Sequence, residues 1–118
     1  MHIEWVTRHD VMVLTVEGEI ALGTAAELNA SLEAALDQGR NPIVVDVAEV
    51  TYIDSGGFSV LHRIIQRLEG KGRLCLVGAN PDLVRMFRIV GLTSQPQFVL
   101  YASLEEASDA AAHGEPPG

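Results

Sequence analysis

The N-terminal part of the chain has the alternation of polar and apolar residues that is typical of β-strands. Residues 2–7 (HIEWVT) alternate in this way, and residues 11–17 (VMVLTVE) are rich in β-branched and apolar side chains. A short polar stretch, Arg8-His9-Asp10, separates them. The two segments are therefore predicted to form a hairpin, closed by Gly18.

From residue 24 the apolar residues recur at intervals of three and four, which is the spacing of an amphipathic helix. Thr24 is the predicted N-cap, because Glu27 follows it three residues later, as in a capping box. Gly39 is predicted to end the helix as a C′ residue. The sequence thus predicts a helix over residues 24–38.

Strands and helices alternate in the rest of the chain. The predicted strands cover residues 43–47, 73–77 and 98–101, and the predicted helices cover residues 57–69, the segment from Asn80-Pro81 to Gly91, and residues 104–112. Asn80 and Ser103 are the predicted N-caps of the last two helices. The apolar face predicted for the helix that follows Asn80 consists of Leu83, Val84, Phe87 and Val90. The order β-β-α-β-α-β-α-β-α is that of an α/β protein with a mixed, mostly parallel sheet of about five strands. We predict one domain over residues 1–112 and a disordered tail over residues 113–118.

Composition narrows the classes of function. The 118 residues are 47% hydrophobic, with a mean hydropathy of +0.19, which suffices for one packed core. The net charge of −8 argues against nucleic acid as a partner. No signal-peptide core and no apolar run of about 18 residues is found, so we expect a cytoplasmic protein that is not membrane-inserted.

The single cysteine excludes an intramolecular disulfide and a metal site built on several cysteines. Cys75 lies in a predicted apolar strand, so we expect a buried and unreactive thiol. No metal or cofactor is expected, because no motif that would bind one is found.

The motif Asp54-Ser55-Gly56-Gly57 follows an apolar run, and the serine has three interpretations. As a nucleophile it would need a base, but His62 on the same helix would lie two turns away, at roughly 10 Å. We therefore expect no catalytic residue and no enzymatic activity. As a structural residue, Ser55 would cap the helix, with Gly56 and Gly57 taking positive φ at a tight turn.

As a phosphoacceptor, Ser55 would be unshielded by its two glycine neighbours. A phosphoserine at a helix N-terminus would find backbone N–H donors, and it would add about −1.5 to −2 charges beside Asp54. In a partner interface this charge would break the contact. The residues alone leave capping and phosphorylation both open.

The chain as a whole resembles the STAS domain family, and among its members the bacterial anti-sigma factor antagonists. The resemblance runs from about residue 3 to residue 112. It rests on VEGEI at 16–20, TAAEL at 24–28, VVDVAEVTYIDSGGFSVL at 44–61 and GRLCLVGANPDLVRMFRIVGL at 72–92. It implies a sheet with helices packed mainly on one side and no catalytic activity.

The resemblance also implies a partner switch. The unmodified protein would bind an anti-sigma factor that is a serine kinase of the GHKL ATPase type. Phosphorylation of Ser55 by this kinase would release it, and a phosphatase would reset the serine. By position, the docking surface would comprise the residues around this serine: Asp54, Gly56, Gly57, Phe58, Ser59 and His62.

Two positions depart from the family pattern. Gly56 stands where a serine or threonine often follows the acceptor, and Ala21 stands where an acid often follows the GE-hydrophobe motif. They motivate an alternative hypothesis, a STAS subunit that needs no phosphoacceptor. Such a subunit would serve a membrane lipid-transport ATPase or a signalling scaffold.

Overall fold

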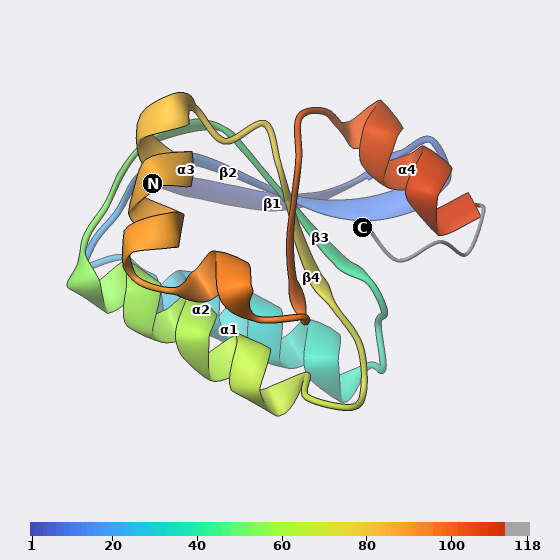
Figure 1. The fold of residues 1–118 in the computed structure, drawn as a ribbon, viewed down its shortest axis with the longest axis horizontal. Coiled ribbons are helices and arrows are strands. Elements are labelled where there is room, and N and C mark those ends of the chain that lie inside the picture. The colour runs from blue at the N-terminus through green and yellow to red at the C-terminus, as the bar shows by residue number, and fades with distance from the viewer. Residues whose placement is uncertain (113–118) are drawn as a thin grey trace.

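The computed structural model describes residues 1–112 and has the predicted order of strands and helices (Figure 1). The elements are β1 (His2–Arg8), β2 (Val11–Ile20), α1 (Ala25–Asp37), β3 (Ile43–Ile53), α2 (Ser55–Arg67), β4 (Leu74–Val77), α3 (Pro81–Ile89), the 3-10 turn η1 (Leu92–Ser94), β5 (Phe98–Tyr101) and α4 (Leu104–Ala112). The predicted disordered tail, residues 113–118, lies outside the described residues.

The five strands form one sheet in the order β1-β2-β3-β4-β5. The β1–β2 pair is antiparallel and the other three pairs are parallel, which confirms the predicted mixed, mostly parallel sheet. The hairpin turn is made by His9 and Asp10, whose φ angles of 51° and 63° are those of the tight turns that connect adjacent antiparallel strands.

The helices cover the two faces of the sheet unequally. α1, α2 and α3 supply residues to the main hydrophobic core on one face, whereas α4 packs on the other face against a smaller cluster around Cys75. Figure 1 shows α1 and α2 side by side along one face and α4 on the opposite side. This arrangement confirms the expectation that the helices pack mainly on one side.

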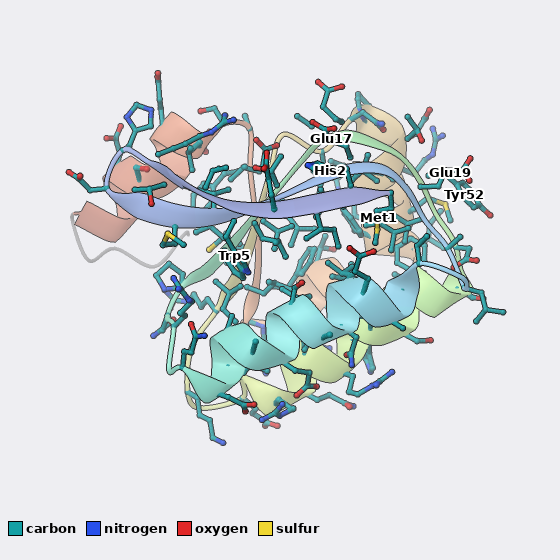
Figure 2. All side chains as sticks on the ribbon, turned by 180° about the vertical axis from the view of Figure 1, so that it is seen from behind. Met1, His2, Trp5, Glu17, Glu19 and Tyr52 are labelled. Carbon is teal, nitrogen blue, oxygen red and sulfur yellow. The ribbon has the colours of Figure 1, made fainter. Side chains whose placement is uncertain are left out.

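The alternation in β1 works as predicted for a half-buried strand. Ile3 and Trp5 pack against the main core, whereas His2 and Glu4 are exposed on the other face. Figure 2 shows Trp5 directed from β1 toward α1 and Glu17 on the other side of the sheet. The guanidinium of Arg40 lies 5.1 Å from the centroid of the Trp5 ring, within the range of a cation–π contact.

The main differences between the predicted and the observed boundaries are in β2, β3 and α2. β2 continues past Gly18 to Ile20, and Gly18 (φ +94°) lies at a shift in the register with β3 rather than at the strand end. β3 runs to Ile53 instead of residue 47, with Asp46 accepting a hydrogen bond from the Ala48 N–H (2.9 Å). α2 begins at Ser55, two residues earlier than predicted.

The predicted helix caps are confirmed at two ends and changed at one. Asn80 accepts a hydrogen bond from the Leu83 N–H (2.9 Å), and Ser103 accepts one from the Glu106 N–H (3.2 Å). Thr24 does occupy the N-cap position of α1, but its hydroxyl makes no capping bond. Instead this hydroxyl accepts a hydrogen bond from the Ala21 N–H (2.9 Å), which shapes the loop between β2 and α1.

Candidate functional site

The Asp54-Ser55-Gly56-Gly57 motif lies at the carboxyl ends of two adjacent parallel strands. β3 ends at Ile53, and α2 begins two residues later at Ser55. The Asp54 N–H donates to the Ile20 carbonyl at the end of β2 (3.0 Å), so both strands hold the turn. In open α/β sheets this edge is where binding sites form.

Asp54 is the residue that caps α2. Its backbone is extended, and its Oδ1 accepts hydrogen bonds from the N–H groups of Gly56 (2.8 Å) and Gly57 (3.1 Å). Its Oδ2 accepts from the Leu22 N–H (2.9 Å) and so connects the start of α2 to the loop between β2 and α1. These bonds, led by that from Gly57, lower the pKa of Asp54 from its usual value, against an opposing desolvation effect.

The structural interpretation of Ser55 as the helix cap is therefore wrong. Ser55 is the first residue of α2, one position after the cap. It is exposed, and its hydroxyl has no hydrogen-bond partner among the described residues, whereas its carbonyl accepts from the Ser59 hydroxyl (2.8 Å). The predicted cap failed by one residue because serine and aspartate are both good N-caps and the sequence does not show where β3 ends.

The two glycines also act differently from the prediction. Neither has a positive φ, so the turn does not use their conformational freedom. Gly57 is needed for close packing, because a Cβ there would lie 2.6 Å from Ile53 Cγ2 and 2.8 Å from Ile20 Cγ2. A Cβ on Gly56 would lie 3.2 Å from the Leu22 Cα. The structure thus places Gly57 in the interior, not on the predicted docking surface.

A groove of about 520 Å³ runs along α2 beside Ser55. It is lined by Ser55, Phe58, Ser59, His62, Arg63, Gln66, Val90 and Leu92. The predicted residues Ser59 and His62 are exposed in it, whereas Phe58 is half-buried and packs edge-on against Phe87, with 5.9 Å between ring centroids. His62 Nε2 lies 3.4 Å from Gln66 Nε2 and makes no bond to Ser55, as expected for residues two turns apart.

Several exposed apolar residues were not identified from the sequence. Leu22 is 81% exposed, and Ile89 and Val90 at the end of α3 are 71% and 43% exposed. Val90, predicted as part of the buried face of α3, is therefore on the surface. The exposure of Ile89 could have been predicted from the sequence, because Ile89 lies outside the apolar stripe that Leu83 and Phe87 form on α3. For Leu22 no local signal existed, because its position follows from the bond to Asp54.

Comparison with known proteins identifies the fold and the family. The sequence profile of the STAS domain family matches residues 2–107. The chain belongs to the STAS domain family. It is 29% identical over 93 residues to the anti-sigma-B factor antagonist of Staphylococcus epidermidis, covering 78% of this chain and 86% of that protein.

Solved structures agree with this assignment. An anti-sigma factor antagonist from Mycobacterium paratuberculosis superposes with a TM-score of 0.81 at 25% identity, covering 94% of this chain and 93% of that one. The Bacillus cell fate determinant SpoIIAA in its phosphorylated form superposes with a TM-score of 0.69 at 23% identity, covering 93% and 99% of the two chains. The second likeness concerns the fold alone.

The structure of residues 1–112 also bears on membrane insertion and on metal binding. None of the helices described there has both the length and the apolar character to span a membrane. The same part of the chain holds no group of three or more histidine, cysteine or acidic side chains placed to bind a metal ion.

Proposed function

We propose that this protein is an anti-sigma factor antagonist that binds an anti-sigma factor with serine kinase activity of the GHKL ATPase type, and that phosphorylation of Ser55 releases this partner. The observation that carries the proposal is the division of roles at the start of α2. Asp54 caps the helix, and the Ser55 hydroxyl is exposed and unbonded among the described residues. A serine that the helix does not need as a cap is available as a phosphoacceptor. The names of the relatives support the same function.

The expected effect of a phosphate on Ser55 follows from the bonds of Asp54. The Gly56 and Gly57 N–H groups, which would otherwise attract a phosphate to the helix start, already donate to Asp54. The phosphate would therefore stay on the surface, beside an ionised carboxylate, with a charge of about −1.5 to −2. It would act on the partner by repulsion and desolvation at the docking surface.

The docking surface in this proposal is the groove beside Ser55 together with Leu22. Leu22 and Val90 supply exposed apolar side chains to this surface, and Arg63 supplies a cation for an acidic group of the partner. Apolar anchors surrounded by polar groups are typical of protein interfaces. The close approach of Gly56 to Leu22 also gives a physical reason why no second hydroxyl residue follows Ser55.

The first test is a pull-down from a lysate of the native host, with the wild type, Ser55→Ala and Ser55→Glu as baits. Wild type and Ser55→Ala should capture a protein with a GHKL ATPase domain, and Ser55→Glu should lose it. Ala30→Glu is the matched control, because Ala30 is exposed on α1 and the substitution adds the same charge. Glutamate carries less charge than phosphoserine, so a large but incomplete loss is the expected result.

The captured kinase, once purified, then tests the chemistry. With ATP it should phosphorylate the wild type on Ser55 alone, and Ser55→Ala should take up no phosphate. Equal capture by all four baits, without phosphorylation, would instead favour the STAS subunit that needs no phosphoacceptor. The identity of the captured protein, a transport ATPase or a scaffold, would then define that role.

A further inference from the structure

The outer edge of β1 is open. β1 is the last strand at one side of the sheet, and within residues 1–112 it pairs with β2 alone. Figure 2 shows β1 at the front of the sheet, with no helix or strand drawn across it. β1 shares no residue with the proposed docking surface beside Ser55. Such an edge presents unpaired N–H and C=O groups to any strand that can pair with them.

The hairpin geometry determines which backbone groups of β1 point outward. Arg8 pairs with Val11 across a two-residue turn, and in such a hairpin the closing pair exchanges both of its backbone hydrogen bonds. Hydrogen-bonded pairs alternate along an antiparallel ladder, so every second residue back from Arg8 also bonds to β2. The N–H and C=O groups of the residues between them, Ile3, Trp5 and Thr7, therefore point away from β2.

β1 lacks the features that usually prevent pairing at the edge of a sheet. Edge strands are commonly very short, bulged or interrupted by proline, or they carry lysine. β1 has seven residues, its register with β2 is unbroken, and it contains neither proline nor lysine. At the other edge of the sheet, β5 has only four residues. The edge of β1 therefore offers a further strand the longer row of partners.

The side chains of β1 carry charges of both signs on one face. Glu4, Val6 and Arg8 share the face opposite the main core, where Val6 packs against the small cluster. Both charged side chains are exposed. Glu4 Oε1 lies 3.8 Å from His2 Nε2, and Arg8 has no ion pair within residues 1–112. A strand with a cation and an anion four residues apart would complement both charges, and β1 itself has this pattern.

The outward-pointing backbone groups limit the register in which two β1 strands can pair. If Val6 lies opposite Val6 of an antiparallel second copy, Trp5 lies opposite Thr7, and these two residues exchange both backbone hydrogen bonds. The same register places Glu4 opposite Arg8 in a non-hydrogen-bonded pair, where side chains lie closest. Each of these pairs occurs twice, because the axis is twofold. A register shifted by two residues would place Trp5 opposite itself and Glu4 opposite Val6.

We propose that two copies of this protein associate through their β1 edges, antiparallel, with Val6 of each copy on the twofold axis. The result is one continuous sheet with five strands from each copy. A second copy is the occupant because it supplies both the free backbone groups and the complementary charges. The inference goes beyond the proposed function and does not rest on it.

The first test is the mass of the full chain in solution. Each copy has a net charge of −8, so the measurement uses about 150 mM salt, where repulsion beyond about 8 Å is screened. Sedimentation equilibrium between about 10 μM and 1 mM should show a reversible rise from 12.7 kDa toward twice this mass. Hydrogen exchange at the Trp5 and Thr7 amides should slow over the same range, and the Val6 amide should change much less. A monomer throughout this range overturns the inference.

Charge reversal tests whether the charges of β1 face each other. Glu4→Arg and Arg8→Glu each place like charges opposite one another twice, so each should weaken association about ten-fold or more. The double variant restores opposite charges and should return to within about three-fold of the wild type. Glu27→Arg, exposed on α1, changes the net charge as Glu4→Arg does and should not weaken association. A double variant as weak as the single variants, or a control that weakens association equally, overturns the inference.

A disulfide tests the register. In Val6→Cys the two new cysteines lie opposite each other with Cα atoms about 4.5 Å apart, within the range of disulfides. Oxidation by diamide should link the two copies. Thr7→Cys is the control, because each new cysteine would lie opposite Trp5. The native Cys75 is 5% exposed and burial raises its pKa to about 11, so it should not react. No linkage in Val6→Cys, or equal linkage in both variants, overturns the proposed pairing.

Discussion

At the scale of single residues, the site depends on two neighbours with separate roles. Asp54 uses both of its carboxylate oxygens within the fold, one for the start of α2 and one for the Leu22 N–H. Ser55 uses no side-chain atom for the fold among the described residues. A modification of Ser55 can therefore change the surface without removing a bond that stabilises the helix.

Asp54→Asn should separate the two functions of the carboxylate. Asparagine is also a good N-cap, so its oxygen can still accept from Gly56 and Gly57. Its NH₂ group would then face the Leu22 N–H, donor against donor. We expect faster hydrogen exchange at the Leu22 amide in this variant, with the Gly57 amide nearly as protected as in the wild type. Equal increases at both amides would contradict the assignment of one oxygen to each element.

The lowered pKa of Asp54 predicts how stability depends on pH. A carboxyl group with a lower pKa in the folded state stabilises the fold above its unfolded pKa, and this stabilisation is lost as the pH falls through the folded value. The difference in free energy of unfolding between the wild type and Asp54→Asn should therefore be constant above about pH 5. It should shrink as the pH drops below the usual value of 3.8. Urea unfolding of both proteins at a series of pH values measures this difference in free energy. A difference that does not depend on pH would contradict the lowered pKa of Asp54.

At the scale of elements, the start of α2 packs tightly against the ends of β2 and β3. Gly57→Ala should destabilise the protein, because the added Cβ would overlap Ile53 and Ile20. The overpacking cost exceeds the gain in helix propensity, so we expect a net loss of about 1–2 kcal/mol. Gly23→Ala is the control: a Cβ there has nothing within 4 Å, and denaturant unfolding should change by less than about 0.5 kcal/mol. Equal effects of the two variants would argue against the close packing.

The exposed apolar residues beside Ser55 should affect binding rather than folding. Leu22→Ser and its control Ile89→Ser, at a residue outside the proposed docking surface, alter side chains that are mostly in solvent, so each should change the free energy of unfolding by less than about 0.5 kcal/mol. If Leu22 anchors the partner, Leu22→Ser should weaken its binding about ten-fold or more, and Ile89→Ser should leave it unchanged. Calorimetry with the purified partner measures both affinities, and unchanged affinity in Leu22→Ser would place the interface elsewhere.

The element boundaries show where the sequence was informative. The alternation of β1, the caps of α3 and α4 and the order of all elements were predictable, because each depends on local spacing or on one capping side chain. The second half of β3 could not be predicted, because it does not keep the period of two that is typical of a strand. Two pairs of consecutive residues are exposed there, Ala48-Glu49 and Thr51-Tyr52. Only pairing with β2, with its shifts in register, makes this segment a strand. Because the end of β3 could not be predicted, the predicted N-cap of α2 fell on Ser55 instead of Asp54.

At the scale of the whole molecule, the two faces of the sheet differ in how firmly they are covered. The main core joins α1, α2 and α3 to one face. On the other face, α4 contributes buried Ala107 and half-buried Leu104 to a small cluster over Cys75. The sequence predicted α4 but not its face, because short helices with few large apolar residues fit either side of a sheet.

This difference predicts that α4 detaches before the rest of the protein unfolds, since elements with few buried apolar contacts open at low free energy. Cys75 reports the opening. In the native state it is 5% exposed and burial raises its pKa to about 11, so alkylation at about pH 8 should be slow. When α4 leaves, the thiol gains water and its pKa falls. Iodoacetamide should then label Cys75 at urea concentrations below those that change Trp5 fluorescence.

Ala107→Asp identifies the helix responsible for this opening. A carboxylate in the small cluster would be costly to bury, so α4 should detach more often and Cys75 labelling should accelerate. The Trp5 transition should move much less, because Trp5 packs against the main core on the other face. Ala30→Asp on the exposed side of α1 should change neither signal. If labelling and Trp5 fluorescence change together in every variant, α4 and the main core form a single cooperative unit, and the small cluster is as stable as the large one.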